Sequence, residues 1–334
     1  MPDPLDRPTV TRVGELAHKY LDGRSRLLVE RIARGRIVDG HGDLLAEDIF
    51  CLDDGPRILD GLEFDDRLRW GDVLYDVGFL AMDLEHLGRR DLAEAFLDWY
   101  REYSAETHPV SLEHHYIAYR ALVRSKISCL RGLADDARQH LAQCQRHLLA
   151  GRIQLVVIGG LPGTGKTTLA AALGDELGWA VLRTDEIRKE LAGVDPLDHA
   201  GDPYGEGLYA PAVTDATYGE LFRRTEALLG RGTSVIVDGS FSQARRRTDA
   251  EVLAARTGTD LTEMRCVLSR DVAADRITRR ALAGEDQSDA TPPIAASMHG
   301  SFDPWPTATA IGTLAPVGDV VRAVLDRLES AHRG

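Results

Sequence analysis

The sequence predicts two domains: a mostly α-helical domain over residues 1–150 and an α/β domain with a parallel sheet of about five strands over residues 151–334. Three observations lead to this prediction. Apolar residues follow helical spacing from residue 72 to about 149. The pattern changes at Gly151, where the unbroken apolar run IQLVVIG (153–159) is followed by glycines, as in a strand buried on both faces. Strand-like and helical runs then alternate, which is typical of βαβ units.

Composition limits the classes of partner. Hydrophobic residues make up 43% of the chain and charged residues 28%, as in ordinary globular proteins. The net charge of −13 disfavours non-specific binding to nucleic acid or anionic membrane, although it is compatible with a local basic pocket. Four scattered cysteines form no C-x-x-C pair, and neither a signal peptide nor a membrane-spanning run is evident. We therefore expect a soluble, cytoplasmic protein, whose oligomeric state the sequence leaves open.

In the N-terminal domain, residues 10 to about 34 are expected to form one helix, with their apolar side chains roughly on one side. A hairpin follows, with strands Ile49–Leu52 and Arg57–Asp60 around the turn Asp-Asp-Gly-Pro. Four successive helices are expected within 72–87, 91–103, 111–127 and 135–149.

In the C-terminal domain, we expect strands over 153–159, 179–182, 234–238, 263–268 and, more weakly marked, 308–312. Helices are expected over 165–177, 213–230, 243–256, 270–283 and 316–330. Residues 284–306 form the segment in which mobility is most expected.

The sequence GLPGTGKT (160–167) fits the P-loop pattern G-x-x-x-x-G-K-T, between a predicted strand and a predicted helix. Its glycines leave room for backbone N–H groups to face phosphate oxygens at a helix N-terminus. Lys166, one of only four lysines, is expected to reach the β- and γ-phosphates of ATP, and the Thr167 hydroxyl to bind Mg²⁺. The expected nucleotide-binding residues are Gly160, Gly163, Thr164, Gly165, Lys166, Thr167 and Thr168.

Further candidates follow the ends of the other strands, where ligands of parallel sheets bind. Asp238, after the third strand, is expected to hold Mg²⁺ or its water, or else to be a helix cap or turn residue. Asp185, after the second strand, is expected to act as a general base or to orient an acceptor hydroxyl, and it also suits the cap of the next helix. Arg276 and Arg280, one turn apart, are expected to clamp the transferring phosphates, whereas a solvated face is an equally good interpretation for Arg279.

On these residues, 151–334 resembles the small bacterial P-loop kinases of the zeta-toxin and polynucleotide-kinase-like group, with an AAA-type ATP-binding domain. The matching segments are the P-loop, Thr184–Arg188, Val235–Phe241 and the arginine pair Arg276/Arg280. The resemblance implies ATP-dependent phosphorylation of a hydroxyl, with Asp185 as the base and Arg188 near the acceptor. It implies no particular acceptor.

HGDLLAEDI (41–49) resembles the catalytic loop of aminoglycoside-phosphotransferase-like kinases, and the chain as a whole resembles bacterial fusions of that fold to a P-loop kinase. Asp43 and Asp60 match the family's base and a Mg²⁺ ligand, whereas Asp48 stands where the family has Asn. Only 40 residues precede His41, and their one lysine, Lys19, falls in a predicted helix. We therefore expect residues 1–150 to be the helical C-lobe alone, catalytically silent, with a structural, regulatory or substrate-presenting role.

Other polar residues of this domain have two interpretations each. Asp43 and Asp60 are expected to hydrogen-bond the loop backbone if they are not catalytic, and Asp72 and Asp76 to cap and anchor the following helix. On one further helix, a solvated face is favoured over an anion site for Arg120, Arg124 and Lys126.

The leading functional hypothesis is a Mg·ATP-dependent kinase of a small-molecule hydroxyl. The acceptor is expected beneath residues 184–215, near Tyr204, Tyr209 and Tyr218, although core packing explains Tyr218 equally well. Two alternatives stay open. One is a switch protein that binds and hydrolyses ATP, and the other is a 5′-hydroxyl kinase of nucleic acid, which would need a basic channel.

Overall fold

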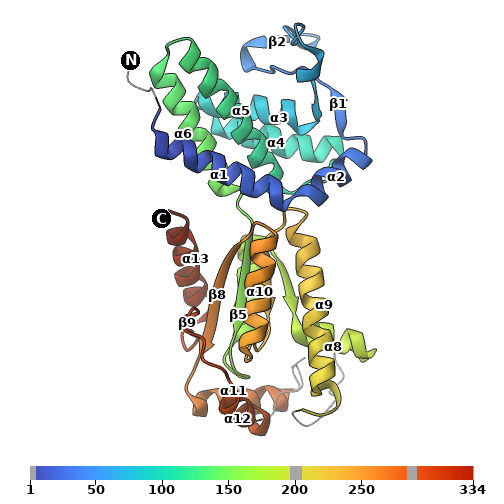
Figure 1. Ribbon diagram of the computed structural model, residues 1–334, viewed down its shortest axis with the longest axis vertical. Helices are drawn as coiled ribbons and strands as arrows, with labels where there is room; N and C mark the ends of the chain where they lie inside the picture. Colours follow the sequence, from blue (N-terminus) through green and yellow to red (C-terminus); the bar gives the residue numbers. More distant parts are fainter. Residues whose placement is uncertain (1–4, 196–204, 284–291, 334) are drawn as a thin grey trace. The chain divides into compact units, whose positions relative to one another are not determined.

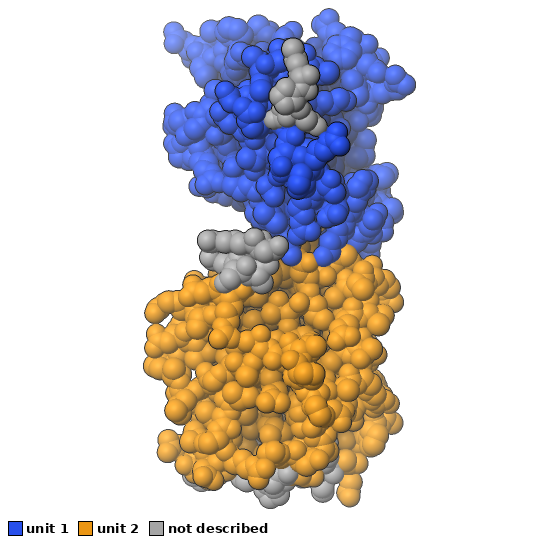
Figure 2. All heavy atoms as spheres, turned by 60° about the vertical axis from the view of Figure 1, so that its left-hand side comes forward, with its two compact units in different colours: residues 1–152 blue, residues 153–334 orange. Residues whose placement is uncertain are grey.

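The computed structural model describes residues 5–195, 205–283 and 292–333. The chain divides into two compact units, residues 1–152 and 153–334 (Figure 2). Each unit has its own apolar core. In the part of the chain that the structure describes, no helix has the length and apolar character that crossing a bilayer requires.

The first unit begins with two helices, α1 (Arg7–Gly23) and α2 (Ser25–Ala33), where one was predicted. The break falls at Arg24, whose backbone leaves helical geometry at φ −121° and ψ 17°. The guanidinium of Arg24 is buried and lies over the Tyr20 ring. The position that breaks the helix is thus occupied by a side chain packed inward, which apolar periodicity does not reveal.

Two small antiparallel ribbons follow. Strand β1 (Ile37–Asp39) pairs with β4 (Trp70–Asp72), and β2 (Ile49–Leu52) pairs with β3 (Gly55–Ile58). The predicted hairpin is present, but its second strand begins two residues earlier than expected. The β1–β4 ribbon was not predicted, because three-residue strands leave too short a pattern to recognise.

The four predicted helices of this unit are present, and their apolar faces form its core. They are α3 (Leu74–His86), α4 (Arg90–Ser104), α5 (Val110–Leu130) and α6 (Ala134–Ala150). The buried guanidinium of Arg31 forms ion pairs with Asp72 and Glu106, which joins α2 to the end of β4 and to the segment before α5.

The second unit is built on a parallel sheet with strand order β6-β7-β5-β8-β9, which confirms the predicted parallel sheet of about five strands. Helices α9 (Pro211–Leu229) and α10 (Ala244–Arg256) cover one face (Figure 1). Helices α7 (Lys166–Leu177) and α13 (Val317–Arg333) pack against the other. The central strand β5 is buried along its whole length. The strands are β5 (Gln154–Gly159), β6 (Ala180–Arg183), β7 (Val235–Asp238), β8 (Asp260–Val267) and β9 (Thr309–Gly312).

The helices of this unit connect the strands as βαβ units require. They are α7 (Lys166–Leu177), α8 (Thr184–Ala192), α9 (Pro211–Leu229), α10 (Ala244–Arg256), α11 (Arg270–Ala283), α12 (Pro292–Gly300) and α13 (Val317–Arg333). Helix α12 lies inside the segment 284–306, in which we expected mobility rather than a helix. Trp305, near the end of that segment, is buried and packs on Phe241 and Arg247. Residues 284–291 lie outside the described part of the chain.

Candidate active site

The P-loop joins β5 to α7, and its conformation requires glycine at defined positions. Gly160, Gly163 and Gly165 have φ values of 137°, 78° and 80°. A Cβ at Gly160 would lie 2.6 Å from the carbonyl oxygen of Cys266, and one at Gly163 would lie 2.6 Å from that of Ala273. The loop therefore wraps closely around its neighbours and presents backbone N–H groups at the start of α7.

Lys166, the first residue of α7, donates a hydrogen bond from Nζ to the carbonyl oxygen of Leu161, 3.1 Å away. Its ammonium group thus lies inside the loop. The Thr164 hydroxyl donates to the same carbonyl at 2.7 Å. These bonds hold the loop closed around the position that phosphates take in P-loop proteins.

Asp238, the last residue of β7, lies beside the P-loop. The Thr167 hydroxyl donates to Oδ2 of Asp238 at 2.7 Å. Burial raises the pKa of the Asp238 carboxyl, against the opposing effects of Lys166 and the Thr167 hydrogen bond. Asp238 is not the cap of α10, because that position belongs to Gln243. The structure therefore brings together the two residues that we predicted as Mg²⁺ ligands.

Asp185 lies in the first turn of α8, after the end of β6. The cap position of α8 is occupied by Arg183, so the cap interpretation of Asp185 is wrong. Instead, Oδ1 of Asp185 accepts a hydrogen bond from Nη1 of Arg188 at 2.5 Å. The Arg188 guanidinium lies 4.8 Å from the centroid of the Tyr209 ring. Arg188, packed against the Tyr209 ring, therefore holds the Asp185 carboxylate in place.

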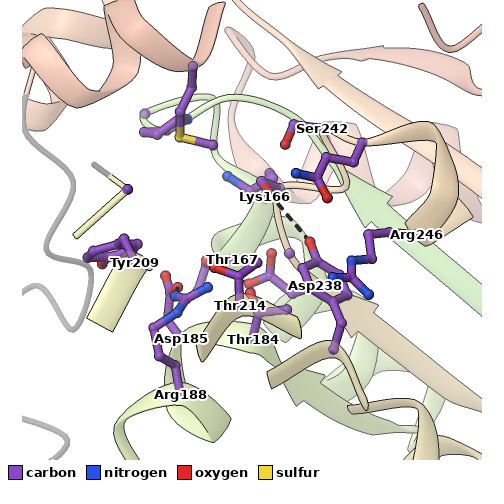
Figure 3. A pocket seen from close by; sticks show the side chains of 18 of the residues that line it. Lys166, Thr167, Thr184, Asp185, Arg188, Tyr209, Thr214, Asp238, Ser242 and Arg246 are labelled. Carbon is purple, nitrogen blue, oxygen red and sulfur yellow. Dashed lines mark hydrogen bonds and ion pairs between the residues drawn. The ribbon is translucent and has the colours of Figure 1, made fainter. Parts of the chain in front are cut away.

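These groups line one cavity of about 240 Å³ (Figure 3). In Figure 3, Tyr209, Asp185 and Arg188 lie on one side and Arg246 on the other, with Asp238 between them. The sequence-predicted residues on its wall are Gly163, Gly165, Lys166, Thr167, Thr168, Asp185, Arg188, Tyr209, Tyr218 and Asp238. Tyr204 lies outside the described residues.

The turn after β7 is strained and is tied to both neighbours. Phe241 is fully buried at φ 45°, a left-handed conformation that side chains rarely adopt. Its N–H donates to the Tyr218 hydroxyl at 3.0 Å, while the Ser240 carbonyl accepts from the N–H of Gly160 at 3.1 Å. Tyr218 thus serves packing and also fixes the turn that carries Asp238 next to the P-loop.

Sequence reasoning missed the wall formed by α10. Arg245 and Arg246 both form ion pairs with Asp215 of α9, and both line the cavity. Arg246 is buried, and its Nε has no hydrogen-bond partner within the described part of the chain. The run Arg245–Arg247, directly after the Val235–Phe241 segment, was the available signal. Its third member points elsewhere, because Arg247 donates to the carbonyls of Asp303 and Pro304.

A second cavity, of about 330 Å³, lies on the other side of the P-loop between α11 and the segment after β9. Nη2 of Arg276 donates to the carbonyl oxygen of Thr313 at 2.9 Å. Arg279 also lines this cavity, and its side chain is exposed, as the solvated-face interpretation of this residue predicts. Arg276 is therefore not on the wall of the cavity that holds Asp185, where a phosphate clamp was expected, and the side chain of Arg280 lies outside the described residues.

In the first unit, the loop that contains Asp43 is held by Asp76. The Asp76 carboxylate accepts hydrogen bonds from the N–H groups of His41 and Gly42, at 2.6 and 2.9 Å. Asp76 thus anchors the loop, the role that we had considered for Asp43 and Asp60. Burial raises the pKa of Asp43, against the opposing charges of Arg124 and Arg120. Asp48 lies near enough to add to that rise, and Asp60 is exposed at φ 63°.

The interpretation of Arg120 as part of a solvated face is wrong. Its side chain is buried, with the guanidinium 3.4 Å from the Tyr75 ring centroid and 4.2 Å from that of Phe79. Nη2 of Arg120 donates to the carbonyl oxygen of Gly42 at 2.8 Å. Arg120 therefore supports the same loop, whereas Lys126 is exposed as expected.

Comparisons with known proteins agree with the P-loop unit. Residues 155–305 match the family model described as an AAA domain. Over 313 residues the chain is 42% identical to uncharacterized proteins of Mycobacterium tuberculosis and Mycobacterium bovis, covering 92% of this chain and 62% of theirs. The chain thus spans less than two thirds of the length of these relatives.

Solved structures with a similar fold include three kinases. APS kinase of Mycobacterium tuberculosis, in complex with AMPPNP and APS, is 22% identical with a TM-score of 0.41, over 53% of this chain and 98% of that one. A gluconokinase of Sinorhizobium meliloti is 18% identical with a TM-score of 0.38, over 53% of this chain and 94% of that one. Shikimate kinase of Aquifex aeolicus is 14% identical with a TM-score of 0.36, over 54% of this chain and 99% of that one. The match to the AAA domain model over residues 155–305 agrees with the P-loop and the parallel sheet of the second unit.

Proposed function

We propose that the protein is a Mg·ATP-dependent kinase that transfers the γ-phosphoryl group of ATP to a hydroxyl of a small molecule. One observation carries the proposal: Lys166 of the P-loop, the Thr167–Asp238 pair and the Asp185–Arg188 pair line a single cavity. A phosphate cradle, a pair of hard oxygen ligands and a carboxylate within one small space are the parts that phosphoryl transfer requires.

The nucleotide would lie across the P-loop. Backbone N–H groups and Lys166 would hold its phosphates, and its base would enter the second cavity, between Arg276 and the segment after β9. That cavity includes the apolar side chains of Leu169, Val317 and Val320, which suit an aromatic base.

The oxygens of Thr167 and Asp238 fit a magnesium ion, because they are hard donors only 2.7 Å apart at the cradle. Magnesium bound there supplies positive charge that draws electron density from the phosphate oxygens. The raised pKa of Asp238 is consistent with a buried carboxylate that needs a cation beside it.

The acceptor would lie over α8, with its hydroxyl directed at Asp185. In this reaction Asp185 takes the hydroxyl proton, the acceptor oxygen bonds to the γ-phosphorus, and the bond from that phosphorus to the β–γ bridging oxygen breaks to release ADP. Arg188 positions Asp185 through their 2.5 Å hydrogen bond. Asp185 is more than one third exposed, so an acceptor can reach it.

We infer further that the acceptor carries an anionic group. Arg188, Arg245 and Arg246 line the acceptor side of the cavity. Asp185 pairs with Arg188, and Asp215 pairs with both Arg245 and Arg246. Asp249 is a further, more distant partner of Arg246, at 3.7 Å. The buried Nε atoms of Arg188 and Arg246 have no hydrogen-bond partner in the part of the chain that the structure describes, so each retains a donor for a ligand.

The proposal can be tested with γ-labelled ATP, Mg²⁺ and a fractionated metabolite extract, comparing wild type with Lys166→Ala and identifying labelled products by mass spectrometry. We expect a labelled, acidic metabolite with wild type only. Release of free phosphate alone, at a rate that no fraction changes, would favour an ATP-hydrolysing switch. A labelled oligonucleotide end would favour the nucleic-acid kinase.

A further inference from the structure

Two histidines and an aspartate gather in the first unit, far in sequence from the P-loop. His86 is the last residue of α3, Asp136 lies in the first turn of α6, and His140 follows Asp136 by one helical turn. Residues four apart in a helix share a face. One ligand atom from each of the three side chains lies within 4.8 Å of the other two, which is the spacing of a metal site. We call these residues the α3–α6 histidine cluster.

Both imidazole rings face one carboxylate. Nε2 of His86 lies 3.0 Å from Oδ1 of Asp136, and Nε2 of His140 lies 3.7 Å from Oδ2. The rings stack on each other, with centroids 3.9 Å apart and planes 16° apart. The second oxygen of Asp136 also accepts a hydrogen bond from the Ser128 hydroxyl at the end of α5, so the carboxylate is held from outside the cluster.

The far side of the His140 ring determines which of its nitrogens carries the proton. Its side chain is 3% exposed, and among the residues that the structure describes its Nδ1 has no hydrogen-bond partner. The neighbouring Gln143 interacts with this ring. Nε2 of Gln143 already donates to the Met82 carbonyl and the Glu85 carboxylate. Its buried Oε1, which has no hydrogen-bond partner in the described ranges of the chain, is therefore the atom left for His140. An acceptor at that place favours the tautomer with the proton on Nδ1.

In that tautomer the lone pair of Nε2 points toward the Asp136 carboxylate. Two electron-rich groups that face each other repel unless a cation lies between them, and the Asp136 side chain, 35% exposed, is open to an ion from solvent. The opposite tautomer leaves Nδ1 of His140 and Oε1 of Gln143 as two buried acceptors. Neither neutral tautomer satisfies all the groups, whereas a bound cation does.

We propose that His86, Asp136 and His140 bind a divalent transition-metal ion of the zinc class. Imidazole nitrogen and carboxylate oxygen are ligands that Zn²⁺ prefers, at bond lengths of about 2.0–2.2 Å, which place donors about 3.3 Å apart in a tetrahedral site. The donors of the cluster, all within 4.8 Å of one another, need to close by about 1.5 Å or less to reach that geometry. His86, at a helix end and 20% exposed, can tilt out of the ring stack to do so.

Metal ligands need neighbouring groups that fix their orientation, and His140 and Asp136 both have such neighbours. Gln143 can fix the His140 ring from behind and Ser128 fixes Asp136, which is the outer-shell arrangement of histidine and carboxylate ligands. The ion would join the end of α3 to the start of α6, next to the end of α5. We therefore assign it a structural role in the first unit, with a fourth position open to water. This inference does not depend on the proposed kinase activity.

The test uses the full chain without a histidine tag, stripped with a chelator and dialysed against micromolar Zn²⁺. Elemental analysis should find one zinc ion per chain, and the melting temperature should rise until one equivalent is added, because an ion that binds only the folded state stabilises it. Cobalt in place of zinc should give the visible absorption of a four-coordinate ion.

His86→Gln and Asp136→Asn should lose the ion, with circular dichroism confirming that the partly exposed His86 variant stays folded. His18→Gln, in the exposed part of α1, is the matched control and should retain it. The proposal is overturned if wild type retains no zinc after dialysis, or if folded His86→Gln retains the same equivalent and the same cobalt spectrum.

Discussion

The arginines of the candidate site differ in how far their charge is already compensated. Arg188 forms one close ion pair with Asp185, whereas Arg245 and Arg246 share Asp215 and Arg246 has a more distant partner in Asp249, 3.7 Å away. Among the described residues, the buried Nε atoms of Arg188 and Arg246 have no hydrogen-bond partner, so each guanidinium keeps part of its hydrogen-bonding capacity for a ligand. At the residue scale, Arg246 lies on the side of the cavity away from Asp185 (Figure 3), which makes α10 the place where an acceptor's anionic group is expected.

Replacing Arg246 by Gln should therefore weaken acceptor binding without affecting ATP. A hydrogen bond to a charged group contributes about 1.5–3 kcal/mol, so the KM for the acceptor should rise roughly tenfold to a hundredfold while the KM for ATP stays the same. Steady-state kinetics with each substrate varied in turn measure both values. Arg223→Gln, on the exposed face of α9, is the control. Equal changes in both KM values would contradict an acceptor-specific role.

The buried carboxyl group of Asp238 leads to a prediction about how the stability of the fold depends on pH. Its pKa is raised from the ordinary value of 3.8, chiefly by burial, so the ionised form is disfavoured in the folded protein. That cost is absent below the unfolded pKa and grows as the pH rises through the folded pKa. Asp238→Asn should therefore raise the melting temperature of the nucleotide-free protein at neutral pH, with a gain that shrinks as the pH approaches 4.

The same variant should lose the thermal stabilisation that Mg·ATP gives to wild type, because a magnesium ligand is gone. Differential scanning fluorimetry with and without Mg·ATP measures both effects. A lower melting temperature at neutral pH, or undiminished stabilisation by Mg·ATP, would show that Asp238 supports the fold rather than the ion.

At the scale of elements, two glycines near α7 are required for different physical reasons. Gly163, in the P-loop before α7, and Gly178, directly after α7, both have positive φ. Only Gly163 also has a carbonyl oxygen close to where a Cβ would lie, 2.6 Å away. Gly178→Ala should cost about 1–2 kcal/mol for the left-handed conformation alone and leave ATP binding unchanged. Gly163→Ala should cost more and abolish ATP binding, because the loop must move away from Ala273.

Calorimetric titration with ATP and denaturant unfolding distinguish the two variants. ATP binding to Gly163→Ala with wild-type affinity would mean that the close packing of the loop on α11 is not needed for nucleotide binding.

The elements that sequence predicted correctly are those with a local pattern. The apolar run of β5, the glycines after it and the regular alternation that follows determine the parallel sheet without knowledge of distant contacts. The break at Arg24, the β1–β4 ribbon and α12 were missed. The break depends on the packing of Arg24 on Tyr20, and α12 lies against α11, whereas β1 and β4 are too short to leave a pattern.

The residues of the candidate site also divide into those that a local sequence pattern predicts and those that it does not. The P-loop, Asp185 and Asp238 could be predicted because the carboxyl ends of parallel strands meet at one edge of a sheet. The wall of Arg245 and Arg246 could not, because its place in the cavity depends on how α10 packs against α9 and on the shared partner Asp215.

At the scale of the whole molecule, we predict that chemistry is confined to the second unit. Asp43→Asn and Asp60→Asn should change the free energy of unfolding more than turnover, because Asp76 and Arg120 hold the loop around Asp43. Denaturant unfolding and phosphoryl transfer, measured on the same preparations, test this. Loss of turnover with the fold intact would show that the first unit takes part in the reaction.

The central claim, that Asp185 accepts the proton of a hydroxyl acceptor while the P-loop presents ATP, is tested most directly by measuring labelled product and free phosphate together in Asp185→Asn. Its neighbour Glu186, whose partner is Arg183, provides the control Glu186→Gln. The account predicts that Asp185→Asn binds ATP as wild type does but forms labelled product about 10²–10⁴-fold more slowly, while Glu186→Gln remains active. Product formation by Asp185→Asn at the wild-type rate would contradict it.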